Sequence, residues 1–193
     1  MRVIKAADHK RMPWKDGGGE TVEIALAPAG AGLDDFDWRV SMARVDVDGP
    51  FSSFAGVDRT LAIVEGEGLT LSIDGRAPLT LTRASAPLSF PGDVATSATL
   101  VAGRVTDLNV MTRRGRFQHR VERLDLSASV EIHVDAALAL LVCVRHGVRV
   151  AALGAEARLA PLDTLRVDEL PGKLQVVAES GAARCYLILL NAV

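Results

Sequence analysis

The sequence predicts an all-β protein built as an antiparallel sandwich or barrel. Apolar and polar residues alternate with a period of two along much of the chain. Combinations of Gly, Pro and Asp that favour turns interrupt this alternation at short intervals, and long helical patterns are scarce. Many short strands separated by such turns are typical of antiparallel sandwiches and barrels.

The alternation is clearest in LTLSI (69–73), where the two leucines and the isoleucine share one face of the predicted strand. The segments 21–28 and 38–47 alternate in the same way. One short helix is expected within 6–12. Turns are predicted at 48–50, 74–75, 91–93 and 171–172.

An internal repeat relates the two halves of the chain. LAIVEGEGLTLSIDG, which begins at Leu61, resembles LLVCVRHGVRVAALG, which begins at Leu140. Two further pairs of similar segments follow, and the offsets within the three pairs lie between about 74 and 79 residues. The repeat predicts a duplicated β unit. We therefore expect two barrels or sandwiches in tandem, at 1–115 and 116–193, with the boundary near 113–120.

The repeat allows matching strands of the two units to be compared for the polarity of their side chains. In the first half, DLNVM places Asp107, Asn109 and Met111 on one face of a strand, whereas the matching segment that begins at Cys185 is apolar on that face. If the face points inwards, the first unit holds a polar pocket and the second a packed core. The alternative is that DLNVM lies at an exposed edge, although such a face more often carries Lys or Glu.

Composition and charge bear on partners and location. The 193 residues carry a formal net charge of -2, with no basic run, so a nucleic-acid partner is not expected. No apolar run approaches the ~18 residues of a membrane span, and MRVIKAADHK lacks the apolar core of a signal peptide. The two cysteines, Cys143 and Cys185, lie in apolar runs. Both are expected to be buried thiols in a cytoplasmic protein, and nothing in the sequence supports a disulfide.

The segment WKDGGGET (14–21) has the glycine density of a phosphate-binding loop without its context. Such a loop leads into a helix and carries Lys followed by Ser or Thr. DGGGET leads instead into the strand pattern at 21–28, and no Gly-Lys-Ser/Thr occurs. We expect a glycine bulge that enters the first strand, with Trp14 and Asp16 near the mouth of a pocket.

A set of polar residues is predicted to line one cavity suited to a small, polar, anionic molecule. Within 38–47, Arg39 and Ser41 share a face, and a buried arginine needs a partner or solvent. The loop GPFSSFAGVDR (49–59) combines aromatic rings, hydroxyls and a guanidinium, which suit a carboxylate. A Gly-Pro turn with core aromatics and a local salt bridge explains this loop equally well. The predicted lining is Arg39, Ser41, Ser52, Arg59, Asp107 and Asn109.

Metal ligation and covalent catalysis have little support in the sequence. The four histidines form no His-x-His motif, and none lies near a carboxylate with metal-ligand spacing. No Gly-x-Ser-x-Gly motif occurs, and both cysteines are expected to be buried. We predict no metal, no other cofactor and no catalytic residue.

Five motifs occur in order along the first half: WKDGGGETVEI (14–24), DFDWRVSMARV (35–45), DGPFSSFAGVDR (48–59), VEGEGL (64–69) and DLNVMTRR (107–114). With them the chain resembles the HutD/Ves family of bacterial proteins, strongly over most of 12–114 and in outline beyond. The resemblance implies a bicupin, two cupin-like antiparallel β-barrels or jelly rolls in one chain, without the usual histidine and glutamate metal ligands. It also implies an association with histidine utilisation, with no established enzymatic activity.

The resemblance extends the expected ligand-binding set. Two positions depart from the family pattern: Asp16 stands where Asn is usual, and Ala55 where Pro is usual. An Asp in place of Asn replaces a donor–acceptor amide with an acceptor-only carboxylate, which alters affinity or specificity if that side chain touches an anion. The full expected set is Trp14, Asp16, Arg39, Ser41, Ser52, Phe54, Asp58, Arg59, Asp107, Asn109, Met111 and Arg113.

The expected function is non-enzymatic binding of a small anionic metabolite. The resemblance implies a carboxylate of histidine breakdown, such as urocanate or a formylated glutamate derivative, sensed to modulate histidine utilisation. One alternative is a metal-independent enzyme on the same ligand class that uses Asp58, Asp107 or Glu65 as acid–base groups. Another is a structural or interaction bicupin whose polar face lies at a dimer seam. A homodimer is compatible with cupin-like barrels, which often pair through sheet edges.

Overall fold

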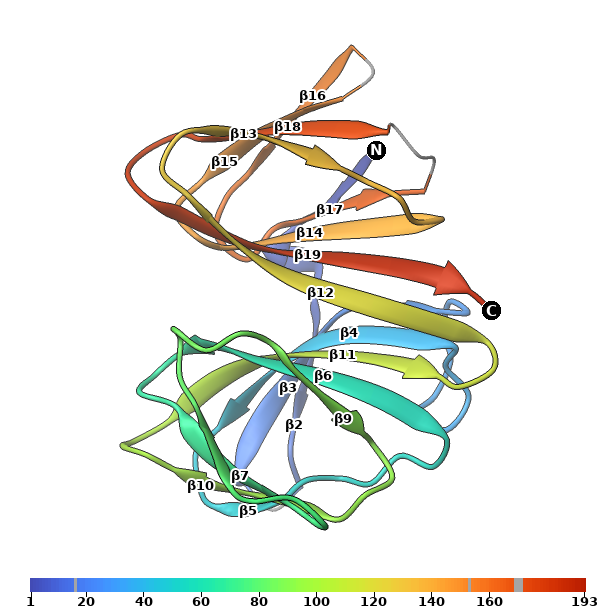
Figure 1. Ribbon diagram of the computed structural model, residues 1–193, viewed down its shortest axis with the longest axis vertical. Helices are drawn as coiled ribbons and strands as arrows, with labels where there is room; N and C mark the ends of the chain where they lie inside the picture. The colour runs from blue at the N-terminus through green and yellow to red at the C-terminus, as the bar shows by residue number, and fades with distance from the viewer. Residues whose placement is uncertain (16, 153, 169–171) are drawn as a thin grey trace. The chain divides into compact units, whose positions relative to one another are not determined.

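The computed structural model describes residues 1–15, 17–152, 154–168 and 172–193, and its regular structure is almost entirely β (Figure 1). The chain divides into two compact units. One comprises Lys10–Gln118, and the other combines Met1–His9 with His119–Val193. We call them the first and the second unit.

The first unit contains two antiparallel sheets. In its six-stranded sheet the order is β2 (Lys10–Pro13), β3 (Gly19–Ala27), β4 (Trp38–Val45), β11 (Val105–Arg113), β6 (Val57–Glu65) and β9 (Leu88–Pro91). In its four-stranded sheet the order is β5 (Gly49–Pro50), β10 (Thr96–Leu100), β7 (Leu69–Ile73) and β8 (Leu79–Leu81).

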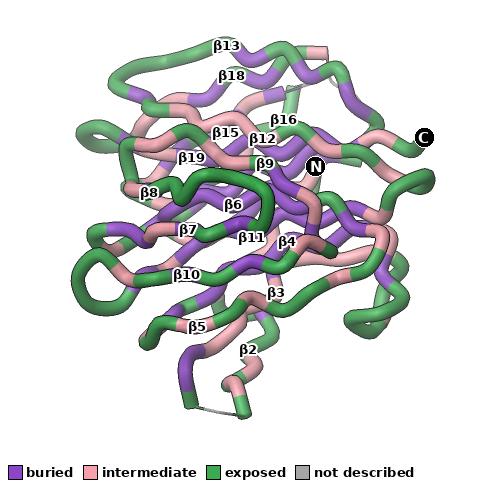
Figure 2. Tube along the Cα trace, turned by 60° about the horizontal axis from the view of Figure 1, so that its bottom comes forward, coloured by how far each residue is buried: buried purple, intermediate pink, exposed green. Residues whose placement is uncertain are grey.

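The inner faces of these two sheets pack together. Leu61 and Ile63 of β6 share one buried cluster with Leu69 and Leu71 of β7 and with Ala98 of β10. Along β7 and β10, buried residues alternate with exposed or half-buried ones, as Figure 2 shows, because successive side chains of a strand point to opposite faces. The period-two pattern of the sequence therefore marks the core of this unit.

The second unit is also built from two sheets. The first has the order β1 (Arg2–Ile4), β17 (Thr164–Val167), β14 (Leu138–Arg145), β19 (Ala183–Ala192) and β12 (Phe117–Leu126). The other has the order β13 (Ser129–His133), β18 (Lys173–Ala178), β15 (Val148–Ala152) and β16 (Ala155–Leu159). One apolar cluster, with Leu141, Val150 and Leu187 among its members, joins residues of both sheets.

The strand orders of the two units match. The run β4-β11-β6-β9 in the first unit corresponds to β12-β19-β14-β17 in the second, and β5-β10-β7-β8 corresponds to β13-β18-β15-β16. The similar segments at Leu61 and Leu140 form β6–β7 and β14–β15, which occupy equivalent places in this scheme. The repeat in the sequence is thus a repeat of topology.

The N-terminal segment departs from the predicted division at 1–115 and 116–193. Met1–His9 belongs to the second unit because β1 pairs with β17, with Val3 opposite Leu165. The helix expected within 6–12 is reduced to one 3₁₀ turn, η1 (Ala6–Asp8), since β2 already begins at Lys10. No helix in the described ranges has the length and apolar character needed to cross a membrane.

Asp163 fastens this segment to the second unit. The carboxylate is buried and accepts hydrogen bonds from the Lys5 ammonium at 2.8 Å, the Ala6 amide at 2.9 Å and the Ala160 amide at 3.1 Å. Asp163→Asn places an amide nitrogen against one of these donors. We expect the free energy of unfolding of the second unit to fall by about 2 kcal/mol.

Hydrogen exchange measured by mass spectrometry checks this prediction, with faster exchange expected in peptides from 1–9 and 160–167. The matched control is Asp168→Asn, an exposed carboxylate that pairs with Arg166 at the surface and whose loss changes stability little. Equal protection of 1–9 in wild type and Asp163→Asn contradicts the prediction.

Candidate functional site

The polar residues of β11 lie on the inner face of the first unit. β11 is a central strand, between β4 and β6, which rules out the exposed-edge alternative. Asp107 lies opposite Ile63 and Asn109 opposite Leu61, the two β6 residues that pack against the four-stranded sheet. Directly opposed residues share a face. Asp107 is 0% exposed and Asn109 2% exposed, so this polar pair lies inside the unit.

The neighbouring strands add two arginines and a serine to the same face. Ser41 of β4 lies opposite Asn109, and Met111 has Arg39 of β4 on one side and Arg59 of β6 on the other. Arg39 is 4% exposed and Arg59 8% exposed. The interior therefore contains two guanidinium groups in one row across three strands. We call Arg39, Ser41, Arg59, Asp107 and Asn109 the polar cluster.

Arg59 is held by an amide and by aromatic rings. Its Nε donates to Oδ1 of Asn109 at 2.7 Å, and its Nη2 donates to the same oxygen. The guanidinium carbon lies 4.5 Å from the centre of the Phe51 ring and 5.7 Å from that of Phe90, both within cation–π range. Within the described chain no carboxylate forms an ion pair with Arg59 at contact distance.

Burial lowers the pKa of Arg59 to about 10, the negative charge of Asp107 acts against this shift, and the positive charge of Arg39 adds to it. The two guanidinium groups therefore lie close enough to repel each other. This repulsion, together with desolvation, makes the row of arginines a favourable place for an added negative charge.

Arg39 has one carboxylate partner. Its Nε donates to Oε2 of Glu23 on β3 at 2.8 Å, and both side chains are largely buried. Glu23 lies opposite Ser41, immediately before an irregularity in the pairing of β3 with β4 between Glu23 and Ala25. Nη1 and Nη2 of Arg39 make no hydrogen bond to any residue that the structure describes.

Asp107 forms the inner end of the polar cluster. Its Oδ1 accepts a hydrogen bond from Nδ2 of Asn109, so the Asn109 amide links the carboxyl group to Arg59. Its Oδ2 is buried and has no hydrogen-bond partner among the described residues. Burial raises the pKa of Asp107 to about 7, although Arg59, Asn109 and the Ala43 amide act in the opposite direction. The carboxyl can therefore accept or donate a proton near neutral pH.

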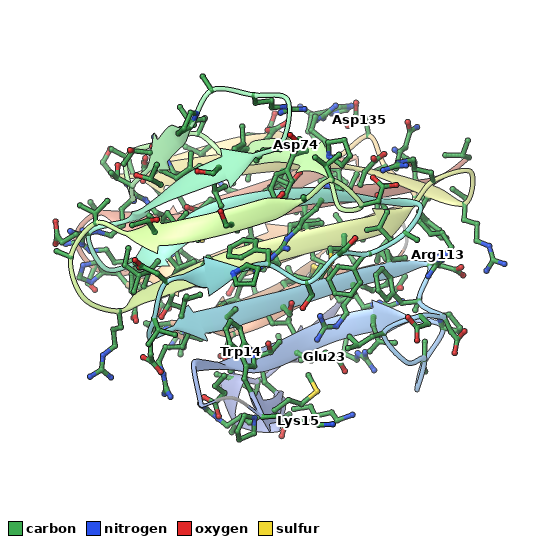
Figure 3. All side chains as sticks on the ribbon, turned by 90° about the horizontal axis from the view of Figure 1, so that it is seen from below. Trp14, Lys15, Glu23, Asp74, Arg113 and Asp135 are labelled. Atoms are coloured by element: carbon green, nitrogen blue, oxygen red, sulfur yellow. The ribbon has the colours of Figure 1, made fainter. Side chains whose placement is uncertain are left out.

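Trp14 follows β2, and Gly19, Glu20 and Thr21 already belong to β3, so the glycines lead into a strand and not into the helix that a phosphate-binding loop requires. The Trp14 amide donates to the Gly19 carbonyl at 2.9 Å, and the Trp14 indole donates to Oγ1 of Thr21 at 2.8 Å. Figure 3 labels Trp14, which follows β2, Glu23 on β3, and Arg113, which lies apart from both. Asp16, the other residue expected near a pocket mouth, lies outside the described residues.

Several residues of the expected set lie away from the polar cluster. Asp58 is exposed and pairs with Arg114 at 2.7 Å, because it is adjacent to Arg59 in the strand and so points to the opposite face. Ser52 is exposed. Phe54 packs edge-to-face on Phe36.

Arg113 has a structural role. It donates to the carbonyl oxygens of Asp34 and Phe36 and stacks over the Phe36 ring, which ties the loop before β4 to the end of β11. Met111 packs with Phe36 and Val57 beside the polar cluster. Residues that the sequence did not single out also contact the cluster. They are Glu23 and Phe90, whereas Phe51, which also contacts Arg59, is one of the aromatic residues that the sequence indicated in the loop 49–59.

Among the described residues, no group of three or more His, Cys, Asp or Glu side chains is placed to hold a metal ion.

Comparison with known proteins identifies the family to which the chain belongs. The HutD family model matches residues 6–185. The chain belongs to the HutD family.

Relatives within the family are similar over most or part of the chain. An uncharacterized 21.2 kDa protein in the hutC 3' region of Pseudomonas putida is 35% identical over 176 residues, covering 89% of this chain and 90% of the relative. Protein Ves of Citrobacter koseri is 39% identical over 122 residues, covering 61% and 62%. The structure of HutD from Pseudomonas fluorescens SBW25 matches with a TM-score of 0.84 at 35% identity, covering 100% of this chain and 98% of that one.

More distant structures confirm the predicted fold class. A cupin 2 conserved barrel domain protein from Leptotrichia buccalis matches with a TM-score of 0.58 at 11% identity, covering 94% of this chain and 96% of that one. At this identity the similarity concerns the fold alone. The chain is an all-β, cupin-like member of the HutD family, with a relative located in the hut region of a genome.

Proposed function

We propose that the first unit binds a small carboxylate at the polar cluster without converting it. The observation that carries this proposal is the row formed by Arg39, Met111 and Arg59. Two buried guanidinium groups lie in this row, and only one of them has a carboxylate partner in the described residues. Nη1 and Nη2 of Arg39 and Nη1 of Arg59 remain available as donors.

A carboxylate suits these donors in charge and in shape. Guanidinium groups bind carboxylates through parallel N–H bonds, and such charge-assisted bonds are strong where water is excluded. An anion near Arg39 and Arg59 also reduces their mutual repulsion, which contributes to the lowered pKa of Arg59. The Phe51 and Phe90 rings beside Arg59 add apolar surface for the rest of a small molecule.

The metabolic context favours a carboxylate of histidine breakdown. HutD of P. fluorescens and the hutC-region protein of P. putida are the relatives that suggest this context. Urocanate and formylglutamate both carry carboxylate groups and are the candidate ligands. In this proposal the protein senses one of them in the cytoplasm and thereby modulates histidine utilisation.

Thermal unfolding in the presence of histidine, urocanate, formylglutamate, glutamate and formate tests the proposal. Both tryptophans, Trp14 and Trp38, lie in the first unit, so tryptophan fluorescence reports its melting. A ligand at 100 times its Kd stabilises the native state by about 2.7 kcal/mol. We expect one carboxylate to raise the Tm of wild type and to have no effect on Arg59→Gln.

The matched control is Arg76→Gln, since Arg76 is an exposed arginine of the same unit with one weak bond to a carbonyl. This variant is expected to respond to the ligand as wild type does. The proposal fails if no compound raises the Tm at millimolar concentration, or if Arg59→Gln responds as strongly as wild type. A Tm that no compound changes would favour a role in protein interaction, for example with the polar face at a homodimer interface.

Asp107 favours a second candidate, a metal-independent acid–base enzyme acting on the same ligands. A buried carboxyl with a pKa raised to about 7 is the kind of group that transfers protons at neutral pH. NMR of each stabilising ligand incubated with the protein distinguishes the candidates. Product formation that is lost in Asp107→Asn while binding persists would favour the enzyme.

A further inference from the structure

The two cysteines of the second unit face each other across neighbouring strands. Cys143 of β14 lies opposite Cys185 of β19, and both thiols are free and buried. Burial was expected from the apolar runs that contain them. Nothing in the sequence indicated that the two residues, far apart along the chain, are directly opposed.

The backbone hydrogen bonds of Cys143 show whether Cys143 and Cys185 form a hydrogen-bonded or a non-hydrogen-bonded pair of the antiparallel strands. The amide of Cys143 donates to the carbonyl of Asp163 at 3.0 Å, and its carbonyl accepts from the amide of Leu162 at 2.6 Å. Both backbone groups of Cys143 therefore point away from β19. The pair is of the non-hydrogen-bonded kind, in which the Cα atoms of opposed residues are about 4.5 Å apart. A disulfide spans Cα separations of about 4.4–6.8 Å, so the backbone is already placed for one.

The two thiols are chemically unequal. The hydrogen bond between them lowers the pKa of Cys143, against burial and the charges of Asp163 and Glu179. The same hydrogen bond, together with burial, raises the pKa of Cys185. The position of the thiols assigns the order of reaction: Cys143 lies next to the exposed residues Arg145 and His146 and is the first thiol that a small molecule meets, and Cys185 reacts second.

Cys143 lies directly beneath a surface turn. Its Sγ is 2.8 Å from the carbonyl oxygen of His146, and Arg145 and His146 are exposed. The pairing of β14 with β19 shifts register between Cys143 and Arg145, and His146 adopts a φ of 55°, which is unfavourable for a residue with a side chain. In the proposal below, a small molecule reaches the buried thiol when this turn is displaced.

We propose that Cys143 and Cys185 form a peroxide-responsive dithiol that closes to an intramolecular disulfide. The Cys143 thiolate attacks one oxygen of a peroxide, the O–O bond breaks, and Cys143 becomes a sulfenic acid. The Cys185 sulfur then attacks the Cys143 sulfur, the S–S bond forms, and the sulfenic oxygen leaves as water. In total two thiols and one hydrogen peroxide give one disulfide and two waters. A cellular dithiol returns the pair to the thiol state by exchange.

This site is independent of carboxylate binding. It belongs to the second unit, whereas the polar cluster belongs to the first, and no residue is common to the two. The disulfide would close a loop of about 40 residues, and loops of that size restrict the unfolded chain appreciably. We therefore expect oxidation to raise the Tm of the second unit.

Treatment of the folded protein with hydrogen peroxide, followed by acid quenching and intact mass spectrometry, tests the proposal. The expected result is the loss of two hydrogen atoms per chain, reversed by dithiothreitol. A single cross-linked peptide pair containing Cys143 and Cys185 is expected in a digest made without reductant. Free thiols that persist until methionines are oxidised, cross-linking seen only in denaturant, or disulfides between chains would each overturn the proposal.

Single serine variants separate the two roles. In Cys185→Ser, the sulfenic acid formed at Cys143 has no resolving thiol, and dimedone is expected to label it. In Cys143→Ser, Cys185 is expected to remain unlabelled. Equal labelling in both variants contradicts the assigned order. The peptide map of the wild-type chain decides the proposal if either variant fails to fold.

Discussion

Replacement of Gly19 with alanine is expected to lower the free energy of unfolding of the first unit by roughly 3 kcal/mol. A Cβ at this position would lie 2.1 Å from the carbonyl oxygen of Arg44 and 3.1 Å from the Trp14 ring. The Arg44 backbone belongs to β4 and is paired with β3 at this point, with Glu20 opposite Arg44. Neither strand can move away without breaking that pairing, so the added methyl group opens the sheet beside the hairpin loop.

Equilibrium unfolding in urea, followed by tryptophan fluorescence, measures this effect. The matched control is Gly17→Ala in the same loop. Gly17 has a φ of 73°, but a Cβ added there would meet nothing within 4 Å, so only backbone strain of about 1 kcal/mol opposes the substitution. If both variants lose the same stability, backbone strain explains the loss and the close approach of Gly19 to Arg44 has no special importance.

Asp107→Asn is expected to stabilise the first unit above neutral pH and to leave it little changed at pH 4. The pKa of Asp107 rises from 3.8 to about 7 on folding, chiefly through burial. Between these values the folded protein binds more protons than the unfolded chain, so the stability of wild type falls as the pH rises through this window. The loss amounts to roughly 4 kcal/mol once Asp107 is ionised, and the neutral amide avoids it.

Urea unfolding of wild type and Asp107→Asn from pH 4 to pH 8.5 tests whether the variant becomes the more stable protein as the pH rises. The difference in unfolding free energy should grow across the window and level off above it. Asp74→Asn, which changes an exposed carboxylate in the turn after β7, is the control and should show no such growth. A pH-independent difference for Asp107→Asn would mean that Asp107 keeps one protonation state throughout.

The sequence predicted the inward face of the polar cluster because strand parity is a local property. Alternation alone grouped Asp107 with Asn109 and Met111, and Arg39 with Ser41. Asp58 was nevertheless expected at the site; it is adjacent to Arg59, so its parity is opposite and its side chain lies on the other face. The position of Arg59 next to Met111 and across from Arg39 depends on the register of β11 with two earlier strands, and parity carries no information on register.

Other features depend on irregularities that a regular pattern does not encode. Alternation gives the face of Glu23, but its contact with Arg39 depends on the register of β3 with β4, which shifts directly after Glu23. Arg113 has the parity of Met111 but lies at the end of β11, where it binds loop carbonyls instead of entering the polar cluster. β1 has three residues and pairs with a strand near the other end of the chain, and a strand this short leaves no periodic signal.

The pairing of β1 with β17 determines the order in which the chain can acquire structure as it leaves the ribosome. Residues 10–118 contain every strand of the first unit, so that unit can fold while the remainder is still being made. Residues 1–9 emerge before the first unit, yet their partner strand begins at Thr164. They remain unpaired until β17 has been made, which is after the whole of the first unit. An N-terminal fusion or tag therefore interferes with the completion of the second unit more than with the start of the first.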